Sequence, residues 1–204
     1  FGGDSSSVSS SLSRNVSAIY STQSAFAALK TDGSVVTWGQ SDFGGDSSSV
    51  SSYLSSGVNV VYSTQLAFAA LKTDGSVVTW GYSDWGGDSS SVSSSLSSDV
   101  SVVYSNDYVF AALKTDGSVV TWGNQYMGGH LGKIYDRVNS AWILVSDVSS
   151  DLTSGVSKIF STGSAFAAVK TDGSVVTWGH SDRGGDSSDV SNNLTSDVSV
   201  IYSN

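Results

Sequence analysis

Hydrophobic and polar residues alternate in short runs that recur along the 204-residue chain. Val16–Ser21 (VSAIYS) alternates apolar and polar side chains, which predicts a half-buried β-strand. Ala25–Lys30 (AFAALK) and residues 34–38 (SVVTW) flank Asp32 and Gly33, a dipeptide typical of two-residue type I′ hairpin turns because both positions need positive φ. The pattern therefore predicts one strand followed by a β-hairpin.

The hairpin is apolar on both faces, since Phe26 and Ala28 alternate with Ala25, Ala27 and Leu29. A sheet with two apolar faces is expected to be covered on both sides by neighbouring sheets. The small alanines would let adjacent sheets approach closely, as near the axis of a ring. The pattern favours a stack or ring of small sheets.

The same unit is repeated along the chain. Residues 31–39 (TDGSVVTWG) recur without change at 73–81, 115–123 and 171–179. The copies begin at Phe1, Phe43, Trp85, Met127 and Arg183, so their spacings are 42, 42, 42 and 56 residues. We interpret residues 1–204 as a single repeat domain with a 14-residue insertion within 127–147 and an incomplete last copy.

The last copy ends after its predicted first strand, residues 198–203, which has no hairpin of its own. An unpaired strand edge invites pairing with another chain. This strand is therefore expected to pair with a protein partner or a second copy, or to pair with the first copy and close a ring. A small closed ring, an open arc completed by another chain, and a section of a long array all remain open.

A serine-rich segment precedes each first strand, and in the first copy it spans residues 4–13. Val8 and Leu12 are four residues apart, which suits a short helical turn capped by Asp4 and equally suits an extended strand. Because similar apolar residues recur in the other copies, we expect an ordered outer strand or turn rather than a disordered linker.

Composition supports an all-β fold. All 18 acidic residues are Asp, there is no Glu, Pro or Cys, and Ser, Gly, Val and Thr are abundant, a composition that favours turns and strands. The net charge of −9 argues against nucleic acid as a partner because such binding needs a basic patch. No run approaches the roughly 20 apolar residues that span a bilayer, so membrane insertion is not expected.

Residues 25–39 (AFAALKTDGSVVTWG), followed by a loop containing Gly44 and Gly45, resemble the repeat of the regulator of chromosome condensation family. In copy four, Asn124, Gly128, Gly129, Leu131 and Gly132 resemble the loop of that family. The resemblance implies that each copy forms one blade of a β-propeller, an antiparallel sheet of three or four strands, and that the whole is an interaction platform. The copies are shorter and fewer than in the family.

Paired aspartates flank the Gly-Gly loop in three copies, and carboxylates with nearby hydroxyls are the hard oxygen ligands that Ca²⁺ prefers. The alternative is that each Asp fixes a turn or caps a helix. The residues concerned are Asp42, Asp46, Asp84, Asp88, Asp182 and Asp186. No other cofactor is expected.

The insertion brings together residue types that are rare elsewhere in the chain, and function in repeat scaffolds tends to lie in such loop variations. It could hold a ligand or a protein partner, or it could simply add a strand. The candidate binding residues are His130, Lys133, Tyr135, Asp136, Arg137 and Trp142.

Two further residues recur in each of the first four copies. Trp38 and its equivalents end the third strand, where a packing role is favoured over a platform for sugars or bases. Lys30 and its equivalents lie beside the Asp-Gly turn and are expected to pair with the turn aspartate, a contact worth little when exposed.

The sequence predicts a non-enzymatic structural or adhesive repeat protein, extracellular or at the cell surface, as a segment of a large surface protein or as a filament subunit. Near-identical copies favour multivalent contacts, whereas chemistry needs one asymmetric site. The alternative is a lectin-like, calcium-dependent propeller that binds a glycan through the insertion. An enzyme is the third hypothesis, with His130 and Asp136 as the residues to test.

Overall fold

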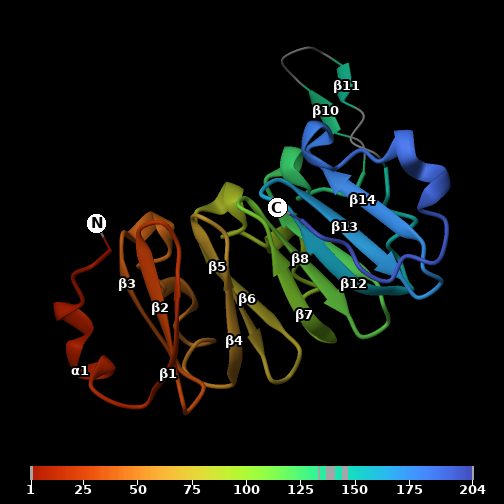
Figure 1. The fold of residues 1–204 in the computed structure, drawn as a ribbon. Helices are drawn as coiled ribbons and strands as arrows, with labels where there is room; N and C mark the ends of the chain where they lie inside the picture. Colours follow the sequence, from red (N-terminus) through yellow and green to blue (C-terminus); the bar gives the residue numbers. More distant parts are fainter. Residues whose placement is uncertain (1, 133, 137–140, 144–146, 204) are drawn as a thin grey trace.

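The computed structural model describes residues 2–132, 134–136, 141–143 and 147–203. In this part of the chain, the strands form four antiparallel three-stranded sheets and one two-stranded hairpin. The four sheets stand side by side along an arc, from β1–β3 at one end to β12–β14 at the other (Figure 1). The all-β prediction of small antiparallel sheets is confirmed, with three strands in each.

Each three-stranded sheet takes its strands in chain order and joins them as an antiparallel meander. We number these sheets 1 to 4. Sheet 1 contains β1 (Val16–Ser21), β2 (Ala25–Lys30) and β3 (Val35–Gly39); sheet 2 contains β4 (Val58–Ser63), β5 (Ala67–Lys72) and β6 (Val77–Gly81); sheet 3 contains β7 (Val100–Ser105), β8 (Val109–Lys114) and β9 (Val119–Gly123); sheet 4 contains β12 (Val156–Ser161), β13 (Ala165–Lys170) and β14 (Val175–Gly179).

Short helical turns connect the sheets. The serine-rich segments, for which a turn and a strand were both open, form helical turns, as in η1 and α1 of the first copy. The helical elements are α1 (Ser9–Leu12) and the 3₁₀ turns η1 (Ser6–Val8), η2 (Ser41–Phe43), η3 (Ser48–Val50), η4 (Ser83–Trp85), η5 (Ser90–Val92), η6 (Gln125–Met127), η7 (Ser181–Arg183) and η8 (Ser188–Asn193). No helix in the described residues is long and apolar enough to cross a membrane.

The hairpin turn between β2 and β3 differs from the prediction. Gly33 has a φ of 77°, but Asp32 is not among the residues with positive φ. Lys30 N–H donates to Ser34 C=O, and Gly33 N–H donates to Lys30 C=O. The turn is thus a three-residue loop with glycine in the left-handed region, which is the usual alternative to the predicted two-residue type I′ turn.

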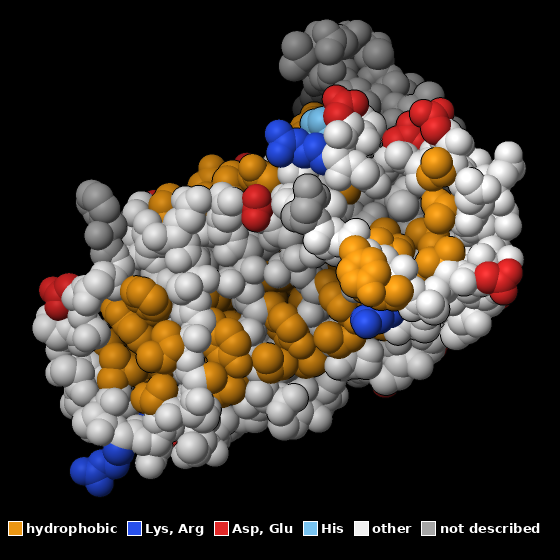
Figure 2. All heavy atoms as spheres, in the orientation of Figure 1, with side chains coloured by type: hydrophobic (Ala, Val, Ile, Leu, Met, Phe, Trp, Pro, Cys, Tyr) orange, Lys and Arg blue, Asp and Glu red, His pale blue; other side chains and the backbone are white. Residues whose placement is uncertain are grey.

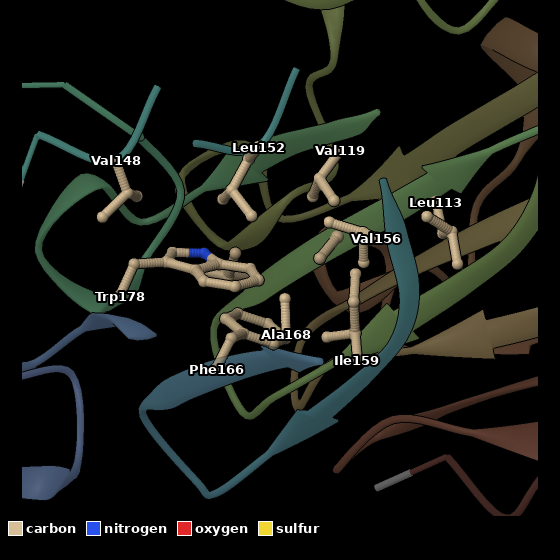
Figure 3. Close-up of a cluster of buried hydrophobic side chains, with 11 residues drawn as sticks. Leu113, Val119, Val148, Leu152, Val156, Ile159, Phe166, Ala168 and Trp178 are labelled. Carbon is tan, nitrogen blue, oxygen red and sulfur yellow. The ribbon is translucent and has the colours of Figure 1, made fainter. Parts of the chain in front are cut away.

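Neighbouring sheets are held together by unlike apolar faces. Between sheets 1 and 2, Ala25 and Ala27 of the first sheet pack against Val61, Phe68 and Trp80 of the second. Equivalent clusters join sheet 2 to sheet 3 and sheet 3 to sheet 4, the latter shown in Figure 3. Every internal interface therefore places an aromatic face against an alanine face, and the prediction that both faces are covered is confirmed there.

The recurrent tryptophan has a packing role, as the pattern favoured. Trp80, Trp122 and Trp178 are at most 3% exposed. Each stacks on the phenylalanine of the neighbouring strand in its own sheet, with ring centroids 5.2 to 5.3 Å apart. Trp80 and Trp122 also donate their indole N–H to the carbonyl oxygens of Gly44 and Gly86 across the interface.

The recurrent lysine does not pair with the turn aspartate as expected. Lys30 Nζ donates to the Ser11 carbonyl oxygen at 3.0 Å, and Lys72 Nζ donates to the Tyr53 carbonyl oxygen at 2.9 Å. Both carbonyl groups belong to the helical turns of the serine-rich segments. The lysine thus fastens the outer segment of each copy to its own sheet by satisfying a carbonyl group that a short helix leaves free.

Residues 198–203 were predicted to form a strand, and this prediction is wrong. The segment has no strand pairing, although Val198 N–H donates to Gly173 C=O in the same way as Val58 N–H does to Gly33 C=O. A strand needs a hydrogen-bonded neighbour, and no strand of the described residues pairs with this segment. The segment lies along sheet 4 without joining a sheet.

Two equivalent glycines test the importance of the close contact between sheets. Gly86 and Gly184 both have left-handed backbones, with φ of 100° and 102°. A Cβ at Gly86 would lie 2.5 Å from Phe110 Cδ2, whereas a Cβ at Gly184 would meet nothing within 4 Å. We expect Gly184→Ala to cost about 1–2 kcal/mol from backbone strain and Gly86→Ala about 1–3 kcal/mol more from overpacking.

Urea denaturation followed by tryptophan fluorescence would measure both variants. Equal losses of stability in the two variants would show that the Gly86–Phe110 contact does not matter.

Candidate protein-interaction site

The first surface of interest is the outward face of sheet 1, which we call the N-terminal end face and define by Ile19, Phe26 and Trp38. No sheet covers these residues in the described part of the chain, although Trp38 is only 9% exposed. Ile19 is 59% exposed, whereas its equivalents Val61 and Val103 are 2% and 1% exposed. Figure 2 shows hydrophobic side chains gathered over β1–β3, with further hydrophobic areas over the neighbouring sheets.

Phe26 shows the same contrast between covered and uncovered copies. It is half-buried, whereas its equivalents Phe68 and Phe110 are fully buried. Phe26 still stacks on Trp38, with ring centroids 5.2 Å apart and planes inclined at 21°. The aromatic pair that fills each internal interface is therefore already formed at the N-terminal end face.

The second surface is the outward face of sheet 4, which we call the C-terminal end face and define by Ala165, Ala167 and Val175. Ala165 is 1% exposed, but Ala167 is half-buried although its equivalents Ala69 and Ala111 are fully buried. A mostly apolar cavity of about 240 Å³ lies on this face, and Ile201 and Tyr202 line its other side. Residues 198–203 cover the face only partly, since Tyr202 is 89% exposed.

A polar groove crosses the turns that join the first and second strands of all four sheets. Gln23 N–H donates to Gln65 C=O, Gln65 N–H to Asp107 C=O, and Asp107 N–H to Gly163 C=O. These hydrogen bonds link successive sheets along the inner edge, where the first strands also contact one another. The groove has a volume of about 540 Å³ and is lined by Ser, Thr, Gln, Asn, Asp and Gly residues.

The predicted binding residues of the insertion lie at the edge of the described structure. His130 is exposed and lines a cavity of about 520 Å³ with Val119, Leu131 and Ser149. Lys133 and Arg137 lie outside the described residues. Tyr135, Asp136 and Trp142 belong to a hairpin formed by β10 (Ile134–Asp136) and β11 (Ala141–Ile143), in which Tyr135 pairs with Trp142 and Asp136 with Ala141, and only their backbones are described.

The insertion therefore does add strands, which was one of its two interpretations, and its ligand-binding role stays a prediction. The insertion also coincides with the loss of one hydrogen bond at the interface between sheets 3 and 4. Trp178 Nε1 is buried without a hydrogen-bond partner among the described residues, unlike its equivalents in sheets 2 and 3.

The paired aspartates of the Gly-Gly loops are exposed, and half of them fix turns. Asp46, Asp88 and Asp186 each accept the backbone N–H of the serine two residues later, at 2.8 to 2.9 Å. Their partners Asp42, Asp84 and Asp182 lie within the 3₁₀ turns that precede the Gly-Gly pair. The described residues contain no group of three or more His, Cys, Asp or Glu side chains that could hold a metal ion, and calcium binding stays a prediction.

Sequence reasoning missed the end faces. Ile19 and Phe26 occupy the same repeat positions as Val61 and Phe68, so no residue type marks them as exposed. The available signal was the order of the copies, because within the described residues sheets 1 and 4 each have one neighbouring sheet.

Comparison with known proteins shows the fold. No protein-family model and no curated protein matches the sequence. Among solved structures, yeast RCC1 (Prp20) in a complex with Kap60 aligns with a TM-score of 0.51 and 16% identity, over 82% of this chain and 44% of that chain. Prp20p from Saccharomyces cerevisiae and human WBSCR16 align with TM-scores of 0.49 and 0.46 and identities of 16% and 22%, over 80% of this chain and 45% and 47% of theirs.

The alignment with yeast RCC1 shows that the chain has an RCC1-like β-propeller repeat fold, as the resemblance implied. The chain spans less than half the length of these similar proteins.

The turn aspartates give a prediction about pH. Hydrogen bonds from the Ser34 hydroxyl and from its backbone N–H lower the pKa of Asp32 below 3.8, and the same holds for Asp74, Asp116 and Asp172 with their serines. A lowered pKa in the folded state stabilises the fold above the ordinary pKa and loses this effect as pH falls through the lowered value.

We expect the free energy of unfolding to be flat from about pH 7 to about pH 5 and to fall below about pH 4. Urea titrations at several pH values would measure it. The matched control replaces Ser34, Ser76, Ser118 and Ser174 by Ala, which should make the acid loss shallower; an unchanged acid slope in the control would contradict the assignment.

Proposed function

We propose that this chain is a non-enzymatic structural scaffold that acts through protein–protein contacts, outside the cell or at the cell surface. The observation that carries the proposal is the pair of apolar end faces. Apolar residues left uncovered on a folded protein mark interaction sites. Here Ile19 is exposed and Phe26, Ala167 and Val175 are half-buried, and they have the same residue types that form the three internal interfaces.

The fold supports a binding role. The similar protein Prp20 has been crystallised with Kap60 bound to it, and Prp20p has been studied for its binding to Gsp1p and histones. Those partners belong to that protein. What carries over to this chain is the use of a propeller-type repeat as a platform for proteins.

Near-identical sheets suit a mechanical or multivalent role better than catalysis, because equivalent surfaces gain from simultaneous contacts. The acidic composition, rich in Ser, Gly and Asp, supports the extracellular part of the proposal. Protease treatment of intact cells of the source organism tests that part: the chain should be cleaved before the cells are lysed, and full protection until lysis would contradict it.

The end faces are tested with a double variant, Ile19→Lys with Ala167→Lys, used as bait for surface proteins of the source. We expect proteins retained by the wild-type chain to fall by about tenfold or more, since a buried lysine at each contact costs over 1.4 kcal/mol. Tyr53→Lys is the matched control, because Tyr53 is 60% exposed and lies on neither end face.

Equal recovery by the double variant and the wild-type chain would contradict the proposal, as would a wild-type chain that retains no protein at all. Thermal unfolding of each variant would confirm that it is folded.

The polar groove favours a second candidate function, the binding of a glycan. Its lining of hydroxyl, amide and carboxylate groups, including those of Ser63, Gln65 and Asp107, matches the hydrogen-bonding groups of a sugar. Gln65→Ala with Asp107→Ala should weaken any glycan detected on an array, measured by calorimetry, whereas His130→Ala should not. Equal weakening by His130→Ala would favour the insertion instead.

A further inference from the structure

The two end faces are the two halves of a single interface. At the N-terminal end face, Ile19, Phe26 and Trp38 are in the register of Val61, Phe68 and Trp80, which fill the interface between sheets 1 and 2. At the C-terminal end face, Ala165, Ala167 and Val175 are equivalent to Ala25, Ala27 and Val35, which form the other half of that interface. One end thus offers the aromatic face, and the other offers the alanine face.

The backbone offers matching groups at the same two ends. The series of hydrogen bonds along the inner edge runs from Gln23 to Gly163 through Gln65 and Asp107. Within the described residues, Gly163 N–H is the next donor of the series, and Gln23 C=O is the next acceptor. A further sheet placed on sheet 4 in the repeat geometry would continue the series with the same pairing.

The segment that now lies on the C-terminal end face is a poor substitute for such a sheet. Residues 183–203 repeat residues 1–21, and the two predicted first strands, VSVIYS and VSAIYS, differ at one position. Val175 N–H donates to Leu194 C=O and Val198 N–H donates to Gly173 C=O, as at the internal interfaces. The apolar side chains nevertheless stay open, with Leu194 half-buried although its equivalents Leu54 and Leu152 are 2% and 1% exposed.

We propose that the C-terminal end face of one chain receives the N-terminal end face of a second copy of this chain. The occupant is a second copy because its sheet 1 brings the residue types and register already found three times inside the molecule. This head-to-tail contact rests on the proposed role of the end faces. Because the two surfaces differ, the contact is heterologous, and its repetition gives a ring or a helical filament rather than a two-fold dimer.

At the contact, residues 2–21 of the incoming copy displace residues 183–203 from sheet 4. The reason is that the C-terminal segment has no strand pairing to lose, whereas β1 is paired with β2 at five positions. The two backbone hydrogen bonds broken at Val175 and Gly173 are re-formed with the equivalent residues of the incoming chain. The gain is the burial of Ile19 and Phe26 against the face that contains the half-buried Ala167.

The test uses two variants of the 204-residue chain, each blocked at one end by a lysine. Ile19→Lys blocks the N-terminal end face and leaves the C-terminal end face intact, and Ala167→Lys does the reverse. Sedimentation velocity and light scattering would follow the mass of each sample up to about 1 mM, with Tyr53→Lys as the control. Circular dichroism would confirm that each variant is folded.

We expect the wild-type chain and Tyr53→Lys to grow beyond the 21.0 kDa monomer as concentration rises, and each blocked variant to stay at 21.0 kDa. A mixture of the two blocked variants should form a dimer of twice 21.0 kDa and grow no further, because its one intact contact contains neither lysine. Electron microscopy of the wild-type assemblies should show rings or filaments.

Three results would overturn the proposal: a wild-type chain that remains monomeric at every concentration, a blocked variant that still associates by itself, or a mixture that forms no dimer. A monomeric chain that retains other surface proteins through the same end faces would reject self-association and leave the proposed function standing. A double variant that retains every partner would reject the proposed function itself.

Discussion

The contact between an aromatic face and an alanine face is the interaction on which the rest of the structure depends. A three-stranded sheet with strands of 6, 6 and 5 residues has too little core to be stable alone, and burial between neighbours provides the missing stability. Phenylalanine and tryptophan supply the buried area, while alanine at the facing positions leaves room for them. Glycines such as Gly44 and Gly86 let the connecting loops pass directly over the aromatic rings.

This arrangement explains why the ends of the stack are apolar. A repeat that buries both faces of each internal sheet must expose one face at each end unless the sequence changes there. Repeat proteins commonly replace the outer face of their terminal repeats with polar residues. Here Ile19 and Phe26 are apolar like the equivalent residues of the internal copies. The residue types of the end faces therefore favour association with another apolar surface.

Much of the fold could be predicted from the sequence, because periodicity and turn residues act locally. The bounds of Val16–Ser21 and Ala25–Lys30 agree with β1 and β2. The turn type could not be predicted, since Asp32-Gly33 fits two loop lengths and the register of Lys30 and Ser34 decides between them. Residues 198–203 have the pattern of a strand, but a strand also requires a neighbour, which periodicity cannot supply.

The candidate site was less predictable for a physical reason. The unusual residue types of the sequence pointed to the insertion. The side chains of residues 133–146 there lie outside the described structure. The end faces consist of ordinary core residues whose exposure depends on position in the stack. Ile19 and Val61 are both aliphatic residues at the same repeat position, yet Ile19 is 59% exposed and Val61 is 2% exposed.

Hydrogen exchange provides the most direct test of the dependence of each sheet on its neighbours. Residues 25–39 and 67–81 have the same sequence, so their intrinsic exchange rates match, and peptides extending to Gln40 and Tyr82 distinguish the two copies. On dilute protein, we expect slower exchange in residues 67–81, which have a sheet on both sides, than in residues 25–39, which have a sheet on one side. Equal rates in the two copies would contradict it.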